Sequence, residues 1–117
     1  VEQKKSEYLA DLIEYQSESD IPIEDFPEYE IFVEDTLKNP DEVYCFLDDS
    51  GDEVFTYVKG HIKNKVPFYY FVICMKFDNP ENDTEEIILP VISFPTQDAR
   101  LCEKYQQGRK ISGNTLN

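Results

Sequence analysis

One apolar run constrains the fold of this chain more than any other feature. Residues Phe68 to Met75 read Phe-Tyr-Tyr-Phe-Val-Ile-Cys-Met, and all eight are apolar or aromatic types that favour strands. A strand with one face in solvent would alternate polar and apolar residues, and this run does not alternate. The run therefore predicts a central strand with both faces covered, around which the rest of the chain is built.

The remaining segments alternate between helical and strand spacing of their apolar residues. The expected elements, in chain order, are helix 5–18, helix 28–37, strand 42–47, strand 53–60, a basic connection 61–65, strand 66–77, a polar loop 78–84, strand 85–94 and helix 98–107. This order predicts an α+β fold with two N-terminal helices, a four-stranded antiparallel meander sheet and one C-terminal helix.

Glycine, proline and a hydroxyl residue mark the ends of these elements. Gly51 lies in an Asp/Ser-rich turn where a positive φ is expected, and Gly108 is expected just after the last helix. Thr96 is a candidate N-cap for that helix. Pro90 has no N–H group, so its strand should lie at a sheet edge or be bulged there. We expect a single domain over residues 1–117: an N-terminal helix and connection over 1–26, an α+β core over 27–108 and a loose tail over 109–117.

Charge is divided unevenly along the chain. The net charge is −14; residues 1–58 contribute −15, from three Lys and eighteen Asp or Glu, and residues 59–117 contribute +1. An acidic half repels nucleic acid and favours basic partners, whereas the second half is open to either. The alternative is that these carboxylates form only a solvated surface.

Composition also bounds the compartment and the ligands. Cys45, Cys74 and Cys102 have no paired spacing, and with a single His they predict reduced thiols and no zinc site. No stretch approaches the roughly 20 apolar residues of a membrane span. The polar start of the chain predicts no signal peptide. We expect a cytoplasmic protein with no membrane contact, no metal and no cofactor.

Basic and polar residues of the second half form a candidate site. Metal-independent RNA cleavage needs a base for the 2′-OH proton, a cation for the phosphorane oxygens and an acid for the leaving oxygen, and His, Lys or Arg, and Tyr or Thr can fill these roles. The candidate residues are Lys59, His61, Lys63, Lys65, Ser93, Thr96, Arg100, Lys104 and Tyr105.

Several of these residues also have a purely structural interpretation. His61 would then be an exposed turn histidine, Tyr105 a core residue, and Arg100 and Lys104 partners of the plentiful carboxylates. The catalytic hypothesis requires His61, Arg100 and Tyr105 to converge on one concave surface. If they lie on separate faces, that hypothesis loses its support.

The order of elements resembles the barnase–EndoU–colicin–RelE superfamily of small ribonucleases. Over roughly residues 28–113, four short segments resemble its phage-associated branch: Asn39–Val43, Phe55–Lys59, Ser93–Asp98 and Tyr105–Gly108. The resemblance implies metal-independent RNA cleavage. It implies polar site groups at Lys59, His61, Thr96, Arg100 and Tyr105. From their charge, we expect Lys63, Lys65 and Lys104 to hold the RNA.

Two other functions stay open. The acidic first half favours a non-enzymatic module that binds a basic protein, as an inhibitor or a nucleic-acid mimic. Because the chain begins at Val1 and not at Met, a structural domain of a longer protein also fits. The acidic module predicts carboxylates along one continuous face and salt-sensitive binding to a basic protein.

Overall fold

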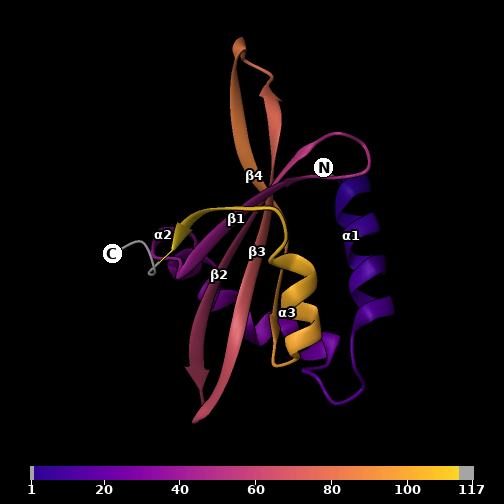
Figure 1. The fold of residues 1–117 in the computed structure, drawn as a ribbon, viewed down its shortest axis with the longest axis vertical. Helices are drawn as coiled ribbons and strands as arrows, with labels where there is room; N and C mark the ends of the chain where they lie inside the picture. Colours follow the sequence, from indigo (N-terminus) through magenta and orange to yellow (C-terminus); the bar gives the residue numbers. More distant parts are fainter. Residues whose placement is uncertain (1, 114–117) are drawn as a thin grey trace.

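The computed structural model describes residues 2–113, an antiparallel sheet with helices packed on both faces (Figure 1). The elements are α1 (Glu2–Tyr15), the 3-10 helix η1 (Ile23–Phe32), α2 (Val33–Lys38), β1 (Glu42–Leu47), β2 (Glu53–Lys63), β3 (Val66–Asn79), β4 (Asn82–Thr96), α3 (Ala99–Tyr105) and β5 (Arg109–Gly113). The strand order is β4-β3-β2-β1-β5. The predicted α+β class and its three helical regions are confirmed; the sheet has five strands, of which the first four form the meander.

Strand β3 has both faces covered, as its apolar run predicts. The residues from Tyr70 to Met75 are each at most 2% exposed. One set of side chains packs with α1 and α3, on what we call the α1/α3 face; the other set packs with η1 and α2, on the η1/α2 face. The first set is Phe71, Ile73 and Met75, and the second is Phe68, Tyr70, Val72 and Cys74.

The predicted helix 28–37 is confirmed as an α-helix from residue 33 onward, but its first part belongs to a 3-10 helix that starts earlier. Residues 23–32 form the 3-10 helix η1, and α-helix α2 covers only the residues from Val33 to Lys38. A 3-10 helix aligns side chains three residues apart. Phe26, Tyr29 and Phe32 have this spacing, and all three pack against the η1/α2 face of the sheet.

The expected basic connection 61–65 belongs instead to a tight hairpin. Strand β2 continues to Lys63, which pairs with Val66 of β3, so the turn consists of Asn64 and Lys65 alone. These two residues have positive φ angles of 52° and 67°. Two consecutive positive φ angles suit the right-handed twist of the strands in such a hairpin.

Lys65→Gly is expected to stabilise the protein by about 0.5–1 kcal/mol, because glycine adopts a left-handed conformation without the steric cost of a Cβ atom. Part of this gain is offset by the greater freedom of glycine in the unfolded chain. Urea denaturation should show a higher midpoint for Lys65→Gly. Lys65→Ala, which keeps the Cβ atom, should show none of this gain, and equal midpoints for the two variants would contradict the prediction.

Strand β4 follows the prediction made from Pro90. It lies at the edge of the sheet, and its register with β3 shifts between Ile73 and Cys74, opposite Pro90. The expected loop 78–84 is shorter than predicted, because Asn79 pairs with Asn82 and both strands continue to that point. The resulting β3–β4 hairpin projects beyond the helices (Figure 1).

The predicted loose tail is wrong over residues 109–113, which form β5 along β1; residues 114–117 lie outside the described part. The carboxylate of Glu42 joins these strands to the end of α3. It accepts hydrogen bonds from Tyr44 Oη (3.0 Å) and Gln106 Nε2 (2.9 Å), and Lys110 Nζ lies 2.7 Å away. Lys110 and these two hydrogen bonds hold the pKa of Glu42 below its ordinary value.

Candidate functional site

The residues predicted to form one catalytic site lie on opposite faces of the sheet. His61 projects from β2 to the η1/α2 face, where its ring stacks 5.8 Å from that of Phe68. Tyr105 belongs to α3 and packs on the α1/α3 face, 5.1 Å from the ring of Phe94. Because the sheet separates them, His61, Arg100 and Tyr105 do not converge as the catalytic hypothesis requires.

His61 occupies a partly buried position against α2 and is not an exposed turn residue. Its Nε2 lies 3.0 Å from Thr36 Oγ1, and that hydroxyl donates its one proton to the Phe32 carbonyl at 2.8 Å. Nε2 must therefore carry a proton and donate to Thr36. Burial lowers the pKa of His61 below its ordinary value, with a smaller opposing effect from Asp35.

The lowered pKa of His61 predicts that acid destabilises the fold. Between the ordinary value near 6.5 and the lower folded-state pKa, the unfolded chain binds more protons at His61 than the folded chain. The free energy of unfolding should therefore fall as the pH falls through this range. Thermal midpoints measured from about pH 7.5 to about pH 5 should fall more steeply for the parent than for His61→Gln. Equal slopes would show that His61 does not contribute.

Lys59 and Lys63 share the η1/α2 face with His61, but each has a structural partner. Lys59 Nζ donates to the Asn39 carbonyl at 2.8 Å and lies 3.5 Å from Asp35 Oδ2. Lys63 Nζ lies 5.3 Å from the centre of the Tyr29 ring. These lysines therefore attach β2 to η1, α2 and the connection after α2. Lys65 is exposed and lies in the turn of the β2–β3 hairpin.

Thr96 is the last residue of β4, and Arg100 lies in the first turn of α3. The two side chains have unlike environments. Thr96 is fully buried, and its hydroxyl donates to Asp20 Oδ2 at 2.5 Å. The predicted N-cap at Thr96 is wrong, because Asp98 caps α3 by accepting from the backbone N–H of Arg100 at 2.9 Å. The Arg100 side chain is 82% exposed and lies 3.9 Å from Asp98.

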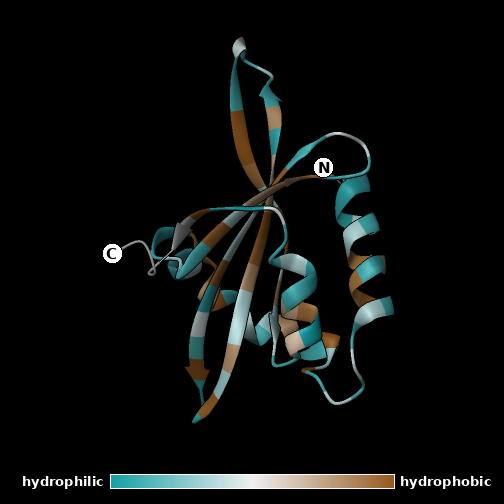
Figure 2. Ribbon diagram, in the orientation of Figure 1, coloured by the Kyte–Doolittle hydropathy of each residue, from teal (hydrophilic) through white to brown (hydrophobic). Residues whose placement is uncertain are grey.

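Lys104 and Tyr105 border a cavity that the sequence did not predict. This cavity of about 630 Å³ lies between α1, α3 and the turn that joins β1 to β2. We call it the acidic groove, and it is lined by the carboxylates of Glu7, Asp11, Asp48 and Asp49, by Tyr8 and Tyr105, and by Lys4 and Lys104. Most of α1 and of this turn is hydrophilic (Figure 2).

Lys4 neutralises only part of the negative charge in the acidic groove. Its Nζ lies 3.2 Å from Asp52 and 3.5 Å from Asp48. Asp11 and Asp49 are exposed and form no ion pair with any residue that the structure describes.

Tyr8 lines the acidic groove, and its phenol group is protonated. Burial, together with the charges of Asp48 and Asp11, raises the pKa of Tyr8 to about 12. Its hydroxyl therefore stays protonated at neutral pH and can donate a hydrogen bond.

Sequence reasoning missed this groove because its walls come from three distant segments. The uneven charge of residues 1–58 was the available signal, but it does not show that α1 lies beside residues 48–50 or near α3. Among the side chains that the structure describes, no group of three or more His, Cys, Asp or Glu could hold a metal ion. Within residues 2–113, no helix is both long and apolar enough to span a membrane.

Comparison with known proteins identifies no relative: no family model, curated protein or solved structure matches this chain. The fold and its surface define the chain as an α+β protein with an acidic groove between α1 and α3. Its function must therefore be inferred from this surface.

Proposed function

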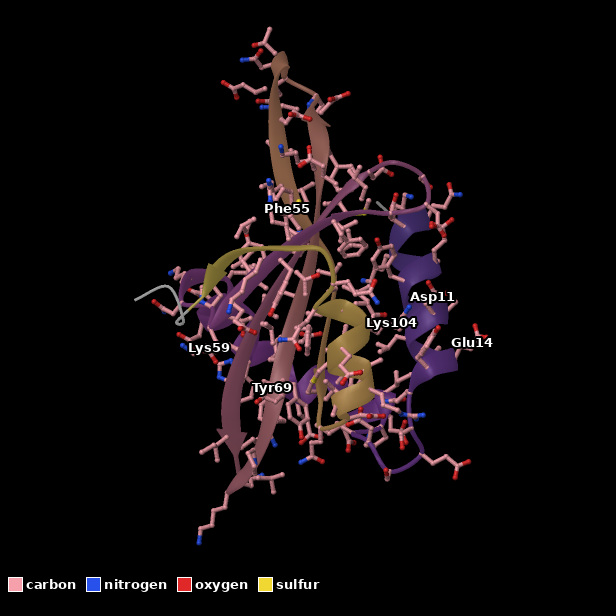
Figure 3. All side chains as sticks on the ribbon, in the orientation of Figure 1. Asp11, Glu14, Phe55, Lys59, Tyr69 and Lys104 are labelled. Carbon is pink, nitrogen blue, oxygen red and sulfur yellow. The ribbon has the colours of Figure 1, made fainter. Side chains whose placement is uncertain are left out.

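We propose that this chain is a non-enzymatic interaction module that binds a basic protein through an acidic face. Six carboxylates make up this face: Glu7, Asp11 and Glu14 of α1, and Asp48, Asp49 and Asp52 of the β1–β2 turn. Figure 3 shows Glu14 projecting outward from α1, and Asp11 of the same helix lines the groove. Lys4 is the basic residue within the face, and it pairs with Asp48 and Asp52.

The observation that carries the proposal is that three of the six carboxylates on this face have no basic partner among the described residues. Asp11, Glu14 and Asp49 are exposed and form no ion pair with any described residue. Like charges at helical spacing destabilise a helix by about 0.2–0.5 kcal/mol per pair, and Glu7, Asp11 and Glu14 have this spacing. A basic partner would relieve this repulsion, and the field of the face would steer that partner toward it.

The three cysteines fit a cytoplasmic location, which we include in the proposal. All three are free. Burial raises the pKa of Cys74 to about 12 and that of Cys102 to about 11, so both thiols stay protonated and unreactive. Reduced, buried thiols are typical of proteins in a reducing compartment.

Binding of a short, labelled polyarginine peptide, followed by fluorescence anisotropy, tests the acidic face. The triple variant Asp11→Asn, Glu14→Gln, Asp49→Asn should bind about tenfold more weakly than the parent, because three exposed charge pairs contribute roughly 0.2–1 kcal/mol each. Binding by the parent should weaken as salt is added.

A matched control removes the same charge from the projecting β3–β4 hairpin: Glu81→Gln, Glu85→Gln, Glu86→Gln. These three side chains are exposed. The control variant should bind nearly as tightly as the parent. If both triple variants lose affinity equally, net charge alone would explain binding and the acidic face would be rejected. Salt-independent binding would also contradict the proposal.

The same purified chain should leave RNA intact. No face of the described structure brings His61 together with Arg100 and Tyr105, so RNA cleavage has no assembled acid–base site to support it. The test is incubation with mixed cellular RNA, without metal, beside a His61→Ala variant. Cleavage by the parent and not by His61→Ala would overturn the interaction module in favour of a ribonuclease.

A further inference from the structure

We propose that the acidic groove binds one arginine side chain of the basic partner, at a position that Lys104 occupies in the free protein. This inference, which rests on the proposed function, assigns a particular side chain of the partner to a particular place on the acidic face. It stands on two further observations: a buried hydroxyl without a partner, and a lysine of this chain that lies against aromatic rings.

The first observation is the hydroxyl of Tyr105. Tyr105 is 5% exposed, and its buried hydroxyl has no hydrogen-bond partner among the described residues. Such groups are rare, because the hydroxyl has lost water without gaining a replacement. Tyr105 lines the groove, and Asp11 and Tyr8 of the same groove are among the groups that raise its pKa, after burial itself. A ligand that occupies the groove would therefore lie beside the Tyr105 side chain.

The second observation is the position of Lys104. Its Nζ lies 4.1 Å from the centre of the Tyr15 ring and 5.5 Å from that of Tyr105. Despite the many carboxylates of the chain, Lys104 forms no ion pair with any of those the structure describes. Figure 3 shows Lys104 in the space between α3 and α1. The chain thus already places a cation against two tyrosine rings at this position.

A guanidinium group fits this position better than the ammonium group of Lys104. It is planar and stacks on aromatic rings, and its five N–H donors can reach several acceptors at once. Two acceptors belong to residues that line the groove: the unpartnered Tyr105 hydroxyl oxygen, which is buried in the free protein, and the exposed carboxylate of Asp11. Lys104 forms no ion pair with a described residue, so an incoming arginine can displace it from the rings.

Tyr105→Phe tests the first observation, because it removes only the hydroxyl. Affinity for the polyarginine peptide should fall about fivefold to tenfold, the effect of one hydrogen bond to a charged group. Affinity for a polylysine peptide of equal length should stay unchanged. The thermal midpoint of this variant should stay the same or rise, because a buried hydroxyl without a partner is removed. Weaker binding in a variant that is no less stable separates a ligand-binding role from a structural one.

Lys104→Gln tests the second observation, with Lys65→Gln as its control. Both substitutions remove one positive charge, but Lys65 lies at the exposed tip of the β2–β3 hairpin. Lys104→Gln should strengthen polyarginine binding by about threefold more than Lys65→Gln does, because it removes a cation that competes for the rings. Equal effects of the two substitutions would overturn the displacement of Lys104.

The outcomes separate the arginine site from the acidic face. If the triple variant of the acidic face weakens binding while Tyr105→Phe does not, the face stands and the arginine site is rejected. If polylysine and polyarginine peptides respond equally to Tyr105→Phe, selection of arginine is rejected. If the parent binds neither peptide, both the proposed function and the arginine site fail.

Discussion

Gly108→Ala is expected to lower the free energy of unfolding by about 2–5 kcal/mol, the sum of a left-handed backbone cost and an overpacking cost. Gly108 has a φ of +87°, and a Cβ atom there would lie 2.3 Å from the Cys45 carbonyl oxygen and 2.7 Å from Phe46 Cβ. These atoms belong to the backbone and the first side-chain carbon of β1. They cannot move aside without disturbing the strand that pairs with β2 and β5.

Gly51→Ala is the matched control for this prediction. Gly51 has a similar φ of +83°, but no atom lies within 4 Å of the place where its Cβ would be. It should therefore show the backbone cost alone, about 1–2 kcal/mol. Urea denaturation of the two variants measures the difference. Equal losses would mean that the contact between Gly108 and β1 does not limit the fold.

Asp20→Ala is expected to lower the free energy of unfolding by about 2–4 kcal/mol, because it leaves buried donors without an acceptor. Asp20 is 8% exposed. Its Oδ1 accepts from the backbone N–H groups of Ile21 (2.8 Å) and Gln97 (2.9 Å), and its Oδ2 accepts from the Thr96 hydroxyl. This carboxylate joins the segment after α1 to the end of β4.

Two further variants make the Asp20 prediction specific. Asp20→Asn keeps one carbonyl oxygen for the two N–H groups, so its loss should be smaller than that of Asp20→Ala. Glu24→Ala removes an exposed carboxylate nearby and should change stability by no more than about 0.5 kcal/mol. A loss in Asp20→Ala as small as that in Glu24→Ala would show that these hydrogen bonds contribute little to stability.

More of the fold than of the candidate site could be predicted from the sequence. The spacing of apolar residues is a property of short segments, whereas the meeting of site residues depends on how distant segments pack. The alternating residues of β1 and β2 predict their strands from 42 to 47 and from residue 53 onward. The predicted catalytic site was wrong for a different reason. His61 and Tyr105 lie on elements that were predicted. Whether the two side chains lie on the same face of the sheet depends on which face α3 packs against.

Features that depend on single residues or short runs could be predicted from the amino-acid sequence. The unbroken apolar run predicts that both faces of β3 are covered. Pro90, which has no N–H group, predicts an edge strand with a register shift, and Gly51 and Gly108 predict positive φ angles. Each of these depends on covalent chemistry or side-chain type within a few residues.

Features that join distant segments depend instead on how the chain packs in three dimensions. Strand β5 has little apolar signal of its own and forms because β1 offers it a free edge. The bonds of Asp20 to Thr96 and Gln97 span more than seventy residues. The acidic groove combines residues of α1, of the β1–β2 turn and of α3. The physical reason is that electrostatic and hydrogen-bonding partners are chosen by proximity in space, which the order of residues along the chain does not specify.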